Sequence, residues 1–166
     1  MDIGPLVEKA VQSISQETLC LGEGTEGDVY AVDDKIALKL YTKNQYRGSS
    51  LDRALHEFEI GRDLHLRSDL RLLQLQIPYY YGLFPPQESP KLNHWGVFME
   101  RIYGVEFDDL SYLLKVKACF QYRKQCKLVE SLGYEIFDSS IDWNTKFDLE
   151  KKKLFLLDLA RWQKRR

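Results

Sequence analysis

The sequence predicts an α+β fold in which a strand-rich first part, residues 1–102, is followed by a helical segment and a final β-hairpin. Short apolar runs separated by turn residues fill the first part, apart from a helical pattern at residues 50–66. Residues 110–132 are helical in composition. Residues 143–147 and 154–157 are apolar pieces around a charged turn, residues 148–153, which indicates a hairpin.

Apolar residues at the start repeat at helical spacing, so we expect a short amphipathic helix over residues 5–15, with a proline near its first turn. The repeating residues are Ile3, Val7, Val11 and Ile14. Residues 18–22 and 28–32 are expected to be short strands on either side of a glycine-rich loop, and residues 35–41 a third strand.

The segment 50–66 returns to a helical period, with acidic residues early and Arg62 late, as the helix dipole favours. The apolar, tyrosine-rich residues 76–84 are ended by a loop with three prolines, residues 85–93. Residues 95–102 form an apolar strand pattern that ends at a glycine. The first part is therefore expected to hold one internal helix among its strands.

Charge and composition argue against several classes of function. Lys and Arg number 24 against 25 Asp and Glu, so the chain is not a polybasic nucleic-acid binder. No run approaches the roughly 18 apolar residues of a membrane span, and no secretory signal is visible. The three cysteines show no metal-ligand spacing, which fits a reducing compartment. We expect a soluble, cytosolic protein without nucleic-acid or membrane partners. A secreted effector acting in a host cytosol stays an alternative, because a disordered bacterial secretion signal escapes these tests.

The basic residues near the end of the sequence are expected to be a solvated helix end or a frayed tail. They are Arg161, Lys164, Arg165 and Arg166.

A glycine-rich stretch, Gly22-Glu23-Gly24-Thr25-Glu26-Gly27, precedes a strand pattern. In dinucleotide-binding folds the third glycine opens a helix, whereas here Gly27 leads into a strand, so the loop joins two antiparallel strands. Such a loop can lie flat over phosphates with its N–H groups toward them. Lys39, on the next strand, shares a face with Ala37 because side chains alternate along a strand. A small and a phosphate-reaching side chain on one face suit a nucleotide site.

This arrangement resembles that of protein kinases. Ile36-Ala37-Leu38-Lys39 is similar to their V-A-I-K strand, whose lysine holds the α- and β-phosphates and pairs with a helix glutamate. The resemblance assigns that glutamate to Glu57, in the helical segment 50–66. Glu59, on a different face of the helix, is the alternative.

The resemblance implies a two-lobed, protein-kinase-like fold. Residues 1–102 would form an N-terminal helix and an antiparallel β lobe with one helix of the αC type. Residues 103–166 would form a truncated, mainly helical second lobe. Because eight residues follow Asp158, an activation loop and late helices are expected to be lacking. The nearest relatives implied are reduced kinases, such as the RIO type and the minimal kinases among bacterial effectors.

The implied cofactors are ATP and Mg²⁺. Met99 would back the adenine pocket, and the backbone of residues 100–102 would offer adenine its hydrogen bonds. The residues expected to bind the nucleotide are Gly22, Gly24, Gly27, Val29, Ala37, Lys39, Glu57, Met99, Glu100 and Ile102.

Asp158 follows an apolar strand directly, where a carboxylate is costly unless something pairs with it. The run Asp158-Leu159-Ala160 stands where kinases have D-F-G, so the resemblance assigns Asp158 and Asn144 to magnesium. The catalytic aspartate is less clear, because no His-Arg pair is present and Ser139 stands five residues before Asn144. Asp138 fits with one inserted residue, and Asp142 fits with a shortened loop.

The leading expectation is an active minimal kinase, with Asp138 or Asp142 orienting an acceptor hydroxyl, by default on a protein Ser or Thr. A small-molecule acceptor is a rival. The alternative is a nucleotide-binding pseudokinase that acts as a protein-interaction module, with the tyrosines at 79–81 as a docking surface. Core packing of a strand is the favoured interpretation of these tyrosines.

Overall fold

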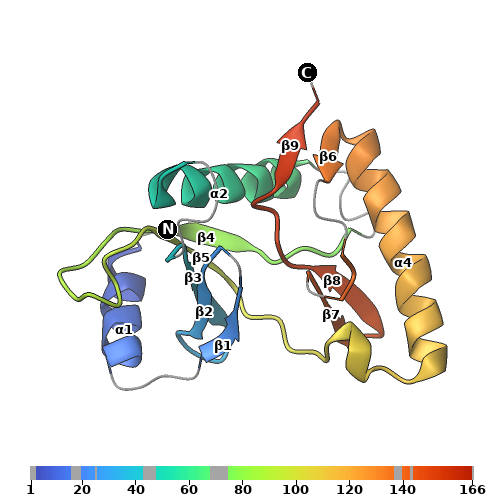
Figure 1. Cartoon of the computed structure of the whole chain (residues 1–166), viewed down its shortest axis with the longest axis horizontal. Helices are drawn as coiled ribbons and strands as arrows, with labels where there is room; N and C mark the ends of the chain where they lie inside the picture. The colour runs from blue at the N-terminus through green and yellow to red at the C-terminus, as the bar shows by residue number, and fades with distance from the viewer. Residues whose placement is uncertain are drawn as a thin grey trace. The chain divides into compact units, whose positions relative to one another are not determined.

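The computed structural model has an α+β architecture, as predicted. It contains a five-stranded antiparallel sheet, two two-stranded ribbons and, in the described part of the chain, three α-helices (Figure 1). The chain divides into two compact units, Met1–Glu59 with Tyr79–Arg101, and Ile60–Pro78 with Ile102–Arg166. Residues 60–78 thus belong to the second unit. The structure describes residues 3–15, 20–24, 26–42, 48–67, 75–136, 140–142 and 144–165.

The sheet of the first unit has the strand order β1-β2-β3-β5-β4, and every neighbouring pair is antiparallel. Its register places Val29, Lys39 and Val97 side by side across three strands. The strands are β1 (Cys20–Glu23), β2 (Asp28–Ala31), β3 (Ile36–Leu40), β4 (Tyr80–Phe84) and β5 (Gly96–Glu100).

Helix α1 (Gly4–Ser15) packs on one face of this sheet and buries Ala10 and Ile14. Leu38 and Leu40 of β3 belong to the same apolar cluster. Because side chains alternate along a strand, Lys39 points to the opposite face. The cluster consists of Ala10, Ile14, Val32, Leu38, Leu40, Phe84, Leu92 and Phe98.

Helix α2 (Ser50–Leu66) has the bounds that the sequence predicts. Its start is a capping box, because the N–H of Asp52 donates to the Ser49 hydroxyl (3.2 Å) while the N–H of Ser49 donates to the Asp52 carboxylate (2.9 Å). The Ser49 hydroxyl also donates to this carboxylate (2.7 Å), and this bond followed by the one from the Ser49 N–H lowers the pKa of Asp52. Residues 50–59 of the helix count with the first unit and residues 60–66 with the second.

The second unit is built on α4 (Tyr112–Ser131), which packs against the β7–β8 ribbon through Ala118, Phe147 and Leu154. Gln125 is buried there and joins two backbone groups, since its amide oxygen accepts from the N–H of Gln76 (2.9 Å) and its NH₂ donates to the carbonyl of Leu154 (2.7 Å). The other elements are the 3-10 turn η1 (Phe107–Asp109), β6 (Tyr134–Ile136), β7 (Thr145–Asp148), β8 (Lys153–Leu156) and β9 (Trp162–Lys164).

In the described residues 161–165 the basic end is neither a helix end nor a frayed tail, so that prediction is wrong there, and Arg166 lies outside the described residues. Residues 162–164 form β9, which pairs antiparallel with β6. The N–H of Arg165 donates to the carbonyl of Gly133 (2.7 Å), and Lys164 lies 3.4 Å from the Asp63 carboxylate. Tyr134 of β6 also donates to Asp63, and burial followed by this bond raises the pKa of Tyr134 above its usual value.

The predicted final hairpin is present, with a shorter tip than expected. Asp148 and Lys153 face each other as the last pair of β7 and β8, so the turn consists of residues 149–152. Its last residue, Lys152, has a positive φ of 54°. Trp143, expected in the first strand, lies outside the described residues. Within the described ranges, no helix carries an apolar run long enough to cross a membrane.

Candidate nucleotide site

Lys39 and Glu57 form a buried ion pair, in which the Lys39 ammonium lies 2.8 Å from Oε2 of Glu57. Only 9% of the lysine side chain and none of the glutamate side chain is exposed. Lys39 comes from β3, and Glu57 comes from the first part of α2, within the first unit. The expected partner of the lysine is therefore Glu57, while the alternative Glu59 is exposed.

Two tyrosines complete the hydrogen bonding of this carboxylate. The Tyr80 hydroxyl donates to Oε1 of Glu57 (2.9 Å), and the Tyr41 hydroxyl donates to Oε2, the oxygen that also accepts from Lys39. Tyr80 is 5% exposed, and Tyr41 is fully buried. A buried charge is stable only when it is paired and hydrogen-bonded, so three donors on Glu57 hold this carboxylate in one position.

The same helix also reaches the glycine-rich loop. Arg53, one turn before Glu57 on α2, is 7% exposed and donates from Nη1 to the carbonyl of Glu26 (3.2 Å). Its guanidinium lies 5.4 Å from the ring centroid of Tyr41, and the Lys39 ammonium lies 5.2 Å from that centroid. Residues four apart share one face of a helix, so this face of α2 holds both the loop and the lysine.

The glycines of the loop have different surroundings. The loop closes through a hydrogen bond from the N–H of Gly24 to the carbonyl of Gly27 (2.8 Å). A Cβ at Gly27 would lie only 1.8 Å from the carbonyl oxygen of Leu40, so this position requires glycine for close packing. A Cβ at Gly22 would meet no atom within 4 Å, so the space beside Gly22 is open.

The other residues expected to bind nucleotide lie in or beside the sheet. Val29 is half-buried next to Lys39, while Ala37 and Met99 are buried neighbours on β3 and β5. The N–H of Glu100 donates to the carbonyl of Tyr79 (2.7 Å), so the sheet already uses that donor. Ile102 is the first residue of the second unit after β5.

The tyrosines around β4 follow strand alternation. Tyr80 is buried in the network of Glu57, Tyr79 is 49% exposed, and Tyr81 packs partly against the α1 cluster. Strand packing therefore accounts for Tyr80 and Tyr81, and Tyr79 is the exposed member of the three.

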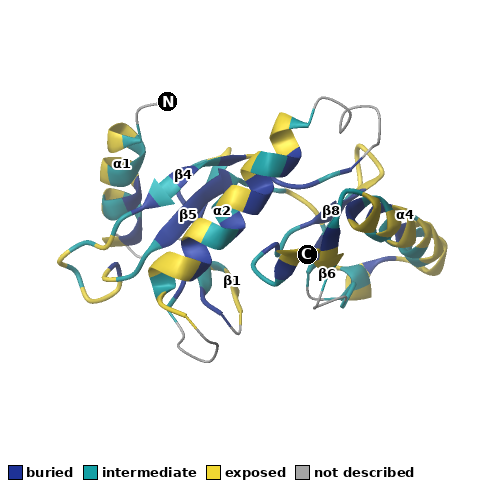
Figure 2. Cartoon of the chain, turned by 90° about the horizontal axis from the view of Figure 1, so that it is seen from above, coloured by how far each residue is buried: buried dark blue, intermediate teal, exposed yellow. Residues whose placement is uncertain are grey.

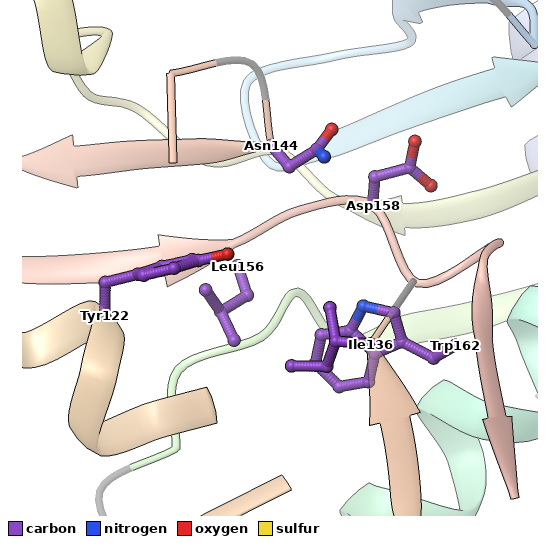
Figure 3. A pocket seen from close by; sticks show the side chains of 6 residues that line it. All are labelled: Tyr122, Ile136, Asn144, Leu156, Asp158 and Trp162. Atoms are coloured by element: carbon purple, nitrogen blue, oxygen red, sulfur yellow. The ribbon is translucent and has the colours of Figure 1, made fainter. Parts of the chain in front are cut away.

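In the second unit the structure brings Asn144 and Asp158 together. The carbonyl of Asn144 accepts from the N–H of Leu157 (2.9 Å), and both side chains line one small hollow of about 10 Å³ (Figure 3). Oδ1 of Asp158 accepts from the N–H of Ala160 (3.1 Å). The hollow is lined by Tyr122, Ile136, Asn144, Leu156, Asp158 and Trp162.

Asn144 and Asp158 offer the oxygen donors that suit magnesium, which usually binds one or two carboxylates together with water and phosphate oxygens. Within the described ranges no group of three or more His, Cys, Asp and Glu side chains comes together. A metal at this place would therefore depend on the two side chains and on oxygens from a ligand, as in nucleotide sites.

The structure describes one of the two candidates for the catalytic aspartate, Asp142. Asp138 lies outside the described residues. Asp142 lies half-buried in the turn before β7, where the carbonyl of the preceding residue, Ile141, accepts from the Thr145 hydroxyl (2.5 Å). The choice between Asp138 and Asp142 stays open.

Comparison with known proteins assigns no family. No protein-family model matches this chain, and no curated protein matches it. The kinase resemblance therefore depends on the motifs and geometry of this chain alone.

The roles of three residues in the site were not predicted from the sequence, namely Tyr41, Tyr80 and Arg53. Arg53 had a detectable signal, because it lies four residues before Glu57 on the same helix face. The tyrosines had none, since apolar strand packing explains tyrosine in a strand without any polar partner.

Proposed function

We propose that this protein is a minimal ATP-dependent kinase, which transfers the γ-phosphoryl group of ATP to a hydroxyl acceptor, by default a protein Ser or Thr. The buried pair of Lys39 and Glu57 is the observation that supports this most strongly. The lysine lies on β3, the second strand after the glycine-rich loop, and the glutamate lies on the next helix, as in the phosphate site of protein kinases. A buried ion pair is weak as a source of stability, so its presence favours a functional role.

Each residue would have a defined task. The N–H groups of the loop and the ammonium of Lys39 would hold the phosphates, and Glu57 would fix the lysine. Asp158 and Asn144 would hold Mg²⁺, which neutralises charge on the phosphate oxygens. The backbone of residues 100–102 would hydrogen-bond adenine through groups other than the N–H groups of Glu100 and Arg101, which already bond within the first unit.

The transfer itself breaks the bond between the γ-phosphorus and its bridging oxygen and forms a bond to the acceptor oxygen, leaving ADP. The acceptor proton passes to the carboxylate of Asp138 or Asp142. Such a reaction needs mainly positioning and charge stabilisation, for which a small scaffold suffices.

Nucleotide binding is tested by the rise in melting temperature that Mg·ATP causes. Gly22→Ala is a sharp probe, because the added methyl meets no protein atom and should leave the melting temperature without ATP unchanged. With ATP present, the methyl would crowd a phosphate above the loop, so the ATP-dependent rise should shrink. Glu23→Ala is the matched control. An undiminished rise in Gly22→Ala would argue against phosphate binding at this loop.

Phosphoryl transfer is tested with γ-labelled ATP, Mg²⁺ and a generic protein substrate. Lys39→Ala in the first unit and Asp158→Asn in the second should each lower labelling by at least about 100-fold. Asp148→Asn, in the β7–β8 hairpin of the same unit, is the control for Asp158 and should retain activity. Label that persists in Lys39→Ala and Asp158→Asn would contradict the assigned site.

Binding of Mg·ATP without phosphoryl transfer would identify the alternative, a pseudokinase. If Mg·ATP raises the melting temperature and no transfer occurs with any acceptor, the protein is a nucleotide-binding pseudokinase. The sequence feature behind this alternative is the lack of an aspartate at position 139, where Ser139 stands.

A further inference from the structure

Arg53 is a buried cation to which the proposed reaction assigns no task. It lies on α2 and is 7% exposed, whereas Arg62 on the same helix is exposed. Figure 2 shows both buried and exposed residues along α2. A charged side chain is rarely buried unless polar partners hold it in place. The partners of Arg53 therefore indicate what it does.

The guanidinium of Arg53 binds two backbone carbonyls from different segments. Nη1 donates to the carbonyl of Glu26 (3.2 Å), and Nη2 donates to the carbonyl of Tyr41 (3.5 Å). Glu26 lies in the glycine-rich loop and is itself 5% exposed, while Tyr41 directly follows β3. A planar guanidinium can serve two acceptors at once. Arg53 therefore ties α2 to the glycine-rich loop and to the end of β3, all within the first unit.

The glycine-rich loop is fixed on the side that Arg53 binds and open on the other. Gly27 packs so closely that a Cβ would lie 1.8 Å from the carbonyl oxygen of Leu40. A Cβ at Gly22, by contrast, would meet no atom within 4 Å. Close packing limits how near the loop can come to β3, whereas the bond from Arg53 to the carbonyl of Glu26 holds the loop there.

Tyr41 connects this anchor to the ion pair of Lys39 and Glu57. The centroid of its ring lies 5.2 Å from the Lys39 ammonium and 5.4 Å from the Arg53 guanidinium. Its hydroxyl donates to Glu57. Attraction between a cation and an aromatic face favours the positions of both cations. The contacts of Arg53 thus set the loop in a fixed place relative to Lys39, and the loop and Lys39 are the parts assigned to the phosphates.

We propose that Arg53 is a positioning residue that holds the glycine-rich loop in place over the phosphates of ATP, an inference that rests on the proposed function. Without this bond the loop would occupy its binding position only part of the time, and the affinity for ATP would fall in proportion. A hydrogen bond from a charged donor is strong enough to make this loss at least about tenfold. Adenosine carries no phosphate, so its affinity should not depend on the loop.

The test is the affinity of the full chain for Mg·ATP and for adenosine, both measured by isothermal titration calorimetry. In Arg53→Met the ratio of the two affinities should fall by at least about tenfold, because only Mg·ATP needs the loop. Arg62→Met is the matched control and should keep the wild-type ratio, because Arg62 is exposed on the same helix. A purely structural loss would lower both affinities together, so the ratio separates positioning from folding.

Arg53→Lys is the second variant, in case Arg53→Met does not fold. Lysine keeps the buried charge but has one ammonium in place of the planar fork, so it cannot serve both carbonyls in the same geometry. Its ratio of affinities should therefore fall by at least about threefold. Melting curves without ligand show which variants fold.

An unchanged ratio in a folded Arg53→Met variant, or in Arg53→Lys if only that variant folds, would overturn the proposal. Equal losses for Mg·ATP and adenosine would also overturn it, and would make Arg53 a structural residue. Both results leave the proposed function standing, since the wild-type protein would still bind Mg·ATP. A wild-type protein that binds neither ligand would contradict the proposed function itself, and this role of Arg53 with it.

Discussion

The pair of Lys39 and Glu57 supports the sharpest prediction about stability. Glu57 has no exposed side-chain surface and accepts hydrogen bonds from Lys39, Tyr41 and Tyr80. Glu57→Ala removes a carboxylate that accepts from a buried ammonium and two buried hydroxyls. Removing one partner of a buried ion pair costs about 3–5 kcal/mol, and the loss of the two hydroxyl bonds puts this variant at the upper end.

The reverse change, Lys39→Met, removes one of the three donors to Glu57 and should cost a similar amount at the lower end of that range, about 3 kcal/mol. The combination of Lys39→Met with Glu57→Ala removes both charges of the pair, so its loss should be smaller than the sum of the two single losses. The coupling free energy between Lys39 and Glu57 should therefore be about 2–3 kcal/mol.

Urea unfolding followed by circular dichroism at pH 7 provides the free energies. Domains are stable by only about 5–15 kcal/mol, so Tyr80→Phe is included as a milder variant that should cost about 1 kcal/mol. Glu59→Gln is the control, because Glu59 is exposed on the same helix and should change stability by less than about 0.5 kcal/mol. Additive losses, with a coupling below about 0.5 kcal/mol, would refute this account of the pair.

Three further predictions concern packing, pH and buried polar groups. Gly27→Ala should lower the free energy of unfolding by at least about 1–3 kcal/mol, because its Cβ would lie 1.8 Å from a carbonyl oxygen of β3. Gly22→Ala should leave this free energy unchanged, and urea unfolding of both variants measures the difference. Burial acts to raise the pKa of Asp33, but hydrogen bonds from a lysine of α1 and two backbone N–H groups outweigh it and lower this pKa. The charged form therefore stabilises the fold above about pH 4, and this is lost as the pH falls through the lowered pKa, so Asp33→Asn should flatten the acid side of a plot of stability against pH. Gln125→Leu should cost about 1–3 kcal/mol for each backbone group left unsatisfied, measured by the same unfolding. Gln121→Leu should cost less, because its bond to the carbonyl of Lys152 is exposed and water can replace it.

Much of the local structure could be predicted from the sequence. Helix α2 has the expected bounds, 50–66, because its apolar period and its capping residues are both local signals. The strands at residues 28–31 and 36–40 agree with the predicted ranges, because the turn residues that separate them are also a local signal. The sequence also pointed to Glu57 as the partner of Lys39, through the likeness to kinase motifs.

The short strands β6 and β9 were not predicted. Each has three residues, and they pair although they lie far apart in the sequence, with Tyr134 opposite Lys164. Such strands exist because a distant segment satisfies their backbone groups, and no local pattern encodes that partner.

The sequence by itself determined the α+β class, most of the helices and strands, and the residue types that a phosphate site needs. Only the tertiary structure decided which side chains surround Glu57, because Tyr41 and Tyr80 reach it through the sheet rather than through any spacing along the chain. It also decided that Leu113, Val116 and Phe120 of α4 are exposed, since composition predicts a helix there but not which face is buried. Hydrophobic period and turn chemistry are local, whereas burial and pairing depend on segments far apart in the sequence.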